Sequence, residues 1–272
     1  MTENNNQIQI APRHYAGIFL LSLATLLLEL SLTRVLSVAL WYHFGFLVIS
    51  TALLGFGASG VVLALWTNLR ERIPLDRALA ILSLLFGVVT IISFWTMQRI
   101  PFDPFSLLSD KRQLLFMPLY YIAIASPFFC SGLAFALLLT RGVKNINRLY
   151  AFDLIGAGVG CAGIAIVMPA FGGSGSVVVA AMLGLFAAAI FGFEKERKLA
   201  VVGAALGALA LPLALFGDKV LPISVTANKT QSPRQPIYTA WNTFSRIDVF
   251  ENPGNPQTGF PPNGPRSPHR PG

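Results

Sequence analysis

The sequence has few charged residues, few cysteines and few histidines. Only 12% of its 272 residues are charged, and it contains two cysteines and three histidines, whereas soluble domains carry roughly a quarter charged residues. Cys130 and Cys161 both lie in apolar runs, which favours small packing residues over a disulfide or a metal site. The shortage of charge excludes an ordinary soluble domain.

Motifs that carry chemistry are also missing from the sequence. His14, His43 and His269 are far apart, so neither a metal site nor a catalytic triad is supported, and there is no P-loop. Gly158 to Gly163 match G-x-G-x-x-G but lie inside an apolar run, whereas a dinucleotide loop needs a preceding strand and an exposed helix N-terminus. We therefore predict no catalytic residue, no cofactor and no metal in this chain.

Long hydrophobic runs dominate the sequence. Hydrophobic residues make up 54% of it, and a run of ~20 apolar residues crosses the ~30 Å of hydrocarbon in a bilayer. Because lipid cannot satisfy an open backbone and the runs lack the alternation of barrel strands, each is predicted to be a helix. The fold class is therefore all-α, a polytopic transmembrane bundle of about seven spans. The predicted spans lie near residues 15–41, 44–67, 78–97, 114–140, 149–170, 175–193 and 199–216.

Polar segments flank this transmembrane domain, which we place at residues 15–217. Residues 1–14 form a polar tail that lacks the basic region of a signal peptide. Residues 218–250 are interpreted as a linker and the start of an incomplete domain, with strand-like alternation from Arg246 to Phe250. Residues 251–272 are rich in proline and glycine, and we expect this short C-terminal tail to be disordered.

The basic residues predict the orientation of the bundle. The net charge of +8 would suit nucleic acid in a soluble protein, but here the basic residues sit in short loops between apolar runs, so no nucleic-acid partner is expected. The positive-inside rule places the N-terminus in the cytoplasm and, after seven spans, the C-terminal tail on the far side of a bacterial cytoplasmic membrane. The N-terminal side carries Arg13, Arg70, Arg72, Arg77, Arg141, Lys144, Arg148, Lys195, Arg197 and Lys198, against Arg99, Lys111 and Arg112 opposite.

Three ionisable residues lie within the predicted spans, namely Glu29, Arg34 and Asp153. At membrane depth each costs at least ~2.5 kcal/mol on insertion scales, so each needs a partner or a wet cavity. Glu29 and Arg34 stand about 140° apart around a helix, which suits a mutual pair poorly, and Asp153 is the obvious partner for Arg34. Two interpretations remain open: an intramembrane substrate or proton site, and a structural clamp or an arginine that reaches the interface.

Small residues four positions apart predict where helices approach closely in lipid. If the protein is a partner subunit of a larger assembly, Gly156 and Gly160 are the residues expected at the interface. The predicted packing pairs are Gly55 and Ser59, Gly156 and Gly160, and Gly203 and Gly207.

Three stretches, Leu28 to Gly60, Asn147 to Gly173 and Trp241 to Phe250, run in the order found in one known family. Within them, Tyr150 to Leu154 and Trp241 to Arg246 are the more specific pieces. The chain resembles the membrane-embedded spermidine synthase-like proteins, in which a multi-span region precedes a soluble aminopropyltransferase-type domain. The resemblance implies that the tryptophan-containing stretch introduces the β part of that domain.

In the family, the catalytic and cofactor residues lie in a methyltransferase-like fold that follows. After Phe250 this sequence continues with proline, glycine and asparagine, so no such residue is carried over and we expect a chain without the catalytic domain. The leading hypothesis is a non-catalytic membrane domain that anchors, or passes substrate to, a synthase-like domain or subunit. Its expected partners are the lipid bilayer, that synthase-like module and, by resemblance alone, polyamine.

The alternative hypothesis is a transporter of small solutes or polyamines. It rests on Glu29, Arg34 and Asp153 within the membrane and on spans interrupted by proline. The leading hypothesis carries a conflict, because a domain that uses a cytosolic nucleoside belongs in the cytoplasm, whereas the predicted topology places Trp241 outside. Either the span count is off by one, or the synthase-like domain acts outside on another substrate.

Overall fold

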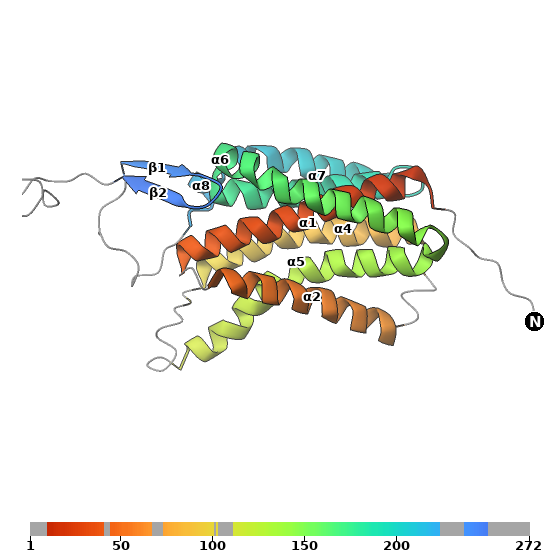
Figure 1. Ribbon diagram of the computed structural model, residues 1–272, viewed down its shortest axis with the longest axis horizontal. Coiled ribbons are helices and arrows are strands. Elements are labelled where there is room, and N and C mark those ends of the chain that lie inside the picture. The colour runs from red at the N-terminus through yellow and green to blue at the C-terminus, as the bar shows by residue number, and fades with distance from the viewer. Residues whose placement is uncertain are drawn as a thin grey trace, which may run out of the picture.

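The computed structural model describes residues 10–40, 44–66, 73–100, 102, 111–223 and 237–249. These residues form a helical bundle with one small β-hairpin at its end (Figure 1). The elements are α1 (Pro12–Ala39), α2 (Gly45–Leu65), α4 (Leu75–Arg99), α5 (Gln113–Arg141), the 3₁₀ turn η3 (Val143–Asn145), α6 (Ile146–Gly192), α7 (Arg197–Leu215), the short α8 (Gly217–Val220), β1 (Tyr238–Trp241) and β2 (Arg246–Val249).

Six of these helices are long and apolar enough to cross a membrane, and the longest is folded in two. Helix α6 has 47 residues and would extend ~70 Å if it were straight, more than twice the ~30 Å of a hydrocarbon core. At Gly172 its backbone has a φ of 74°, a conformation that favours glycine. The helix therefore divides there into an arm before Gly172 and an arm after it.

Contacts with α1 establish that the two arms are antiparallel. Gly156 of the first arm packs on the backbone of Phe19, and Phe191 of the second arm packs on Gly17. Both arms thus reach the same level of α1, although one residue lies before the break and the other lies well after it. The described residues consequently run through the bundle seven times, and the predicted bundle of about seven helical spans is confirmed.

The helices pack in a defined order across the bundle. Helix α1 packs mainly on α6, which also contacts α4 and α7, while α4 contacts α5 and α5 covers α2. The interior holds large aromatic side chains that are fully buried, among them Phe86, Phe94, Phe128 and Phe191. Helices α2 and α7 form the two outer sides, and their outward faces carry exposed apolar side chains such as Phe46 and Leu209. Such faces suit hydrocarbon better than water.

The small residues that we singled out lie at contacts between helices. Gly55 and Ser59 of α2 both pack on α5, Ser59 beside Gly132. Gly203 and Gly207 of α7 pack on the second arm of α6. Gly156 and Gly160 pack on the backbones of Phe19 and Leu23 in α1 of the same chain. They are buried within the bundle, so the idea that they form an interface with another subunit is wrong.

The ends of the elements differ in detail from the expected spans. Helix α1 begins at Pro12, which occupies the first helical position and fixes a backbone angle suited to a helix start. Residues 42 and 43, between the first two predicted spans, and the expected disordered tail at residues 251–272 lie outside the described part of the chain.

We predict that Gly156→Leu destabilises the bundle, whereas Gly158→Leu does not. A Cβ at position 156 would collide with the backbone of Phe19, which cannot rotate away, but a Cβ at position 158 meets nothing within 4 Å. The expected loss is about 2 kcal/mol of unfolding free energy for Gly156→Leu. Thermal unfolding of the two purified variants in the same detergent measures it, and equal midpoints would contradict the helix contact described above.

Candidate functional site

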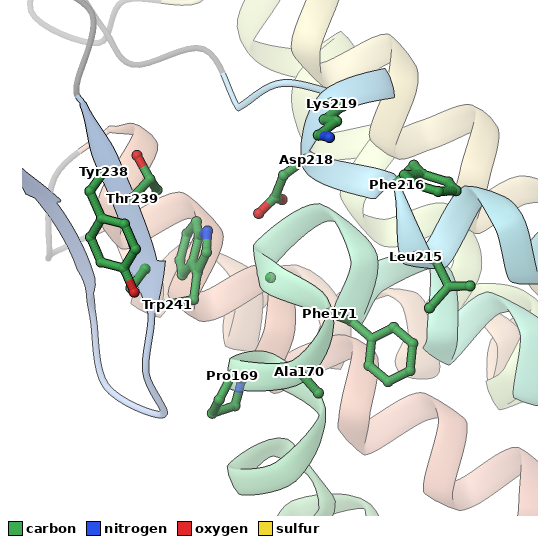
Figure 2. A pocket seen from close by; sticks show the side chains of 12 residues that line it. Pro169, Ala170, Phe171, Leu215, Phe216, Asp218, Lys219, Tyr238, Thr239 and Trp241 are labelled. Atoms are coloured by element: carbon green, nitrogen blue, oxygen red, sulfur yellow. The ribbon is translucent and has the colours of Figure 1, made fainter.

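A pocket lies at the end of the bundle where α6 is broken. Its volume is 440 Å³, and three parts of the chain line it: the α6 break around Gly172, the end of α7 together with α8, and strand β1. Figure 2 shows the carboxylate of Asp218 pointing toward the space between the ring of Trp241 and the α6 break. The pocket lies at the opposite end of the bundle from the first residues of α1 (Figure 1).

Asp218 of α8 fixes the start of the second α6 arm. The backbone N–H of Ser174 donates to Oδ1 of Asp218 at 2.9 Å, and the hydroxyl of Ser174 donates to the carbonyl of Leu221 at 2.6 Å. The first N–H groups of a helix have no partner within it, and a carboxylate satisfies both their hydrogen bonds and the positive end of the helix dipole. Asp218 therefore ties α8 to the break and shapes one wall of the pocket.

The side chain of Trp241 packs the β-hairpin against the same break in α6. Its side chain is buried, 8% exposed, and a Cβ added to Gly173 would come within 3 Å of its ring, so glycine makes room for the indole. The hairpin is antiparallel, with Trp241 opposite Arg246, and the side chain of Asn242 accepts the backbone N–H groups of Phe244 and Ser245 in its turn. The strand expected from Arg246 is confirmed as far as Val249.

Polar side chains brace the hairpin from the face that bears Trp241. The hydroxyl of Thr239 and Nε of Arg246 both donate to Oδ1 of Asp248, each at 2.8 Å. The guanidinium of Arg246 also lies 5.9 Å from the centre of the Trp241 ring. These contacts hold the indole and the two strands in one arrangement.

The three ionisable residues expected within the membrane do not form one site. Asp153 accepts a hydrogen bond from the hydroxyl of Ser22 at 2.7 Å. Arg34 lies twelve residues further along α1, about 18 Å away at 1.5 Å per residue, and its guanidinium stands 5.9 Å from the ring centre of Phe244 in the hairpin turn. The expected pairing of Asp153 with Arg34 is therefore wrong.

Glu29 is half-buried on α1 and is not among the residues that line the pocket, nor are Arg34 and Asp153. The prediction that pairs Arg34 with Asp153 failed because it considered which charges could match and not how deep along the helices each one lies. The expectation of a substrate or proton site at these residues stays a prediction.

A buried ionic cluster at the other end of the bundle was missed by the sequence reasoning. The side chain of Asp76 is 4% exposed and lies within 3.1 Å of three basic groups: Nε of Arg13, Nε2 of His14 and Nζ of Lys195. Arg13 also pairs with Glu194. The cluster joins the start of α1, the start of α4 and the turn between α6 and α7.

His14 is oriented within this cluster by its own helix start. Its Nδ1 accepts the backbone N–H of Ala11 at 3.0 Å, so the proton of the neutral ring lies on Nε2, toward Asp76. Asp76 stands in the first turn of α4, where the helix dipole favours an acid. The sequence signal for this acid was its place directly after Pro74 and Leu75, but its partners lie in two distant parts of the sequence.

Nothing at either end supports a metal site or a nucleotide loop within the described residues. No group of three His, Cys, Asp or Glu side chains comes together there. Gly158 to Gly163 lie inside the first arm of α6, not at a helix N-terminus. Comparisons with protein-family models, with curated proteins and with solved structures found no match.

We predict that Asp76→Asn destabilises the bundle by about 3 kcal/mol, because it leaves the charged groups of Arg13 and Lys195 without their buried counter-charge. Glu194→Gln serves as the matched control, since its side chain is 61% exposed and exposed pairs contribute little. Thermal unfolding in detergent compares the two variants. If both unfold at the midpoint of the unchanged protein, the cluster does not hold the helices together.

Proposed function

We propose that this chain is the membrane domain of a spermidine synthase-like, or polyamine aminopropyltransferase-like, protein. In this proposal it anchors a synthase-like module, or passes substrate to it, at the end of the bundle opposite the start of α1. The observation that supports the proposal is the seat of the β-hairpin, in which Trp241 is buried against the α6 break. The stretch that in the resembling family leads into the synthase domain is thus packed on the helices.

The hairpin has a second face that suits a module. Opposite the face of Trp241 it presents apolar side chains to solvent: Tyr238 is 62% exposed, Ile247 52% and Val249 47%. Two strands alone are marginally stable, and their outer edges offer unpaired backbone groups to further strands. An apolar face together with free edges is typical of a sheet to which more structure adds. No catalytic residue is assigned to this chain, because the chemistry would belong to the module.

The orientation of the bundle is part of the proposal. The start of α1 and the hairpin lie at opposite ends of the bundle (Figure 1), and the basic side chains of Arg13, Arg141 and Lys195 gather near the former. In a bacterial cytoplasmic membrane the positive-inside rule would put that end in the cytoplasm. The module would then work on the outer side of the membrane.

Reporter fusions test this topology. A phosphatase that folds only in an oxidising compartment should be active when it is fused after Phe250 and inactive when it is fused after Lys144, which follows α5 at the opposite end. A fluorescent protein that folds only in the cytoplasm should give the reverse pattern. Equal signals from the two positions would mean an even number of crossings between them and would contradict the orientation.

Photocrosslinking tests the anchoring function itself. A photoreactive residue in place of Ile247 should capture, in native membranes, a polypeptide that contains an aminopropyltransferase-type domain, identified by mass spectrometry. The same residue in place of Val143, 63% exposed at the other end of the bundle, is the matched control and should not. Adding Trp241→Ala should weaken the capture because it unseats the hairpin. Capture of lipid alone at position 247 would refute the proposal.

A further inference from the structure

The pocket at the α6 break lies where the bundle changes from apolar to polar. Leu215, the last residue of α7, and Phe216 directly after it are 59% and 55% exposed, and both line the pocket. The next residues, Asp218 and Lys219, are charged and exposed. An apolar surface that gives way to charge within one turn marks the level at which lipid tails give way to headgroups. The pocket therefore opens at that boundary.

The pocket contains one acid and one base that are not paired with each other. Oδ1 of Asp218 accepts the N–H of Ser174, while Oδ2 stands beside Gly172 on the side of the break. The ammonium of Lys219 lies 5.9 Å from the centre of the Phe216 ring. Among the described residues no ion pair joins Asp218 to Lys219. A ligand that bears both charges can therefore satisfy both side chains.

The aromatic ring of Trp241 in β1 completes the lining. Trp241 presents its ring on the wall opposite α6, whereas the ring of Tyr238 lies on the other side of β1 (Figure 2). An aromatic face attracts an ammonium group, and the attraction is stronger where water is partly excluded. The volume of 440 Å³ lies within the range of small-ligand sites.

From these observations we propose that the pocket binds the headgroup of a zwitterionic phospholipid that carries a primary ammonium, namely an ethanolamine headgroup. The ammonium lies between Oδ2 of Asp218 and the ring of Trp241, the phosphate pairs with Lys219, and the acyl chains lie along Leu215 and Phe216. One acid and one base match a zwitterion better than an anionic lipid or a polycation. This site goes beyond the proposed anchoring function and does not depend on it.

Native mass spectrometry of the full chain tests the site. The protein, released from nanodiscs that contain equal amounts of phosphatidylethanolamine and phosphatidylglycerol, should retain the ethanolamine lipid at least ~10-fold over the glycerol lipid, a free-energy difference of ~1.4 kcal/mol. Lys219→Gln and Asp218→Asn should each abolish this preference. The asparagine keeps an oxygen to accept the N–H of Ser174, so the helix start is preserved. Lys111→Gln is the matched control, an exposed lysine near the start of α5 and outside the pocket.

The outcomes separate the alternatives. Equal retention of the two lipids, or a preference that Lys219→Gln leaves unchanged, would overturn the proposal. If soluble phosphoethanolamine displaces the lipid when both are present at the same concentration, the natural ligand is a small metabolite and not a lipid, and the proposal is overturned. Thermal unfolding in lipid-free detergent shows whether each variant is folded. If the photoreactive residue at position 247 captures no synthase-like polypeptide while the lipid preference is present, the anchoring function is refuted and the lipid site is not.

Discussion

The arrangement of the bundle depends on the reversal of α6 at Gly172. A helix in lipid cannot open its backbone without new hydrogen-bond partners, and the break exposes the N–H groups that begin the second arm. Gly172 supplies the backbone conformation, and Asp218, in a short helix 44 residues after Ser174, supplies one of the missing acceptors. Because both arms then pack on α1, the same reversal sets the position of α7, of α8 and of the hairpin.

The sequence predicts well those features that depend on the composition of a continuous segment. The runs of apolar residues were sufficient to locate the helices, and the gap between the predicted spans 149–170 and 175–193 contains Gly172, where α6 is broken. Small residues four apart indicate a helix contact but not its partner, which is why Gly156 and Gly160 were open to two interpretations. Their contact with Phe19 and Leu23 became evident only from the fold.

Features that join distant segments were beyond the reach of the sequence. Asp76 gains its three basic partners from α1 and from the turn after α6, and nothing in the sequence around position 76 specifies either contact. The error in pairing Asp153 with Arg34 has a related cause, because charge alone does not fix the depth at which a side chain sits along its helix. Ser22, an uncharged residue, lies at the right depth and takes that place.

The two ends of the bundle differ in how they satisfy charge, and this difference bears on function. At the start of α1, a buried carboxylate is surrounded by basic groups of the same chain, so its charge is compensated within the protein. At the α6 break, Asp218 and Lys219 remain exposed beside an open pocket, and an arginine of α1 lies against the hairpin turn. Trp241 is shared by the hairpin seat and the pocket wall. A headgroup held against Trp241 would therefore also fix the height of the hairpin above the bilayer, because the same ring contacts both.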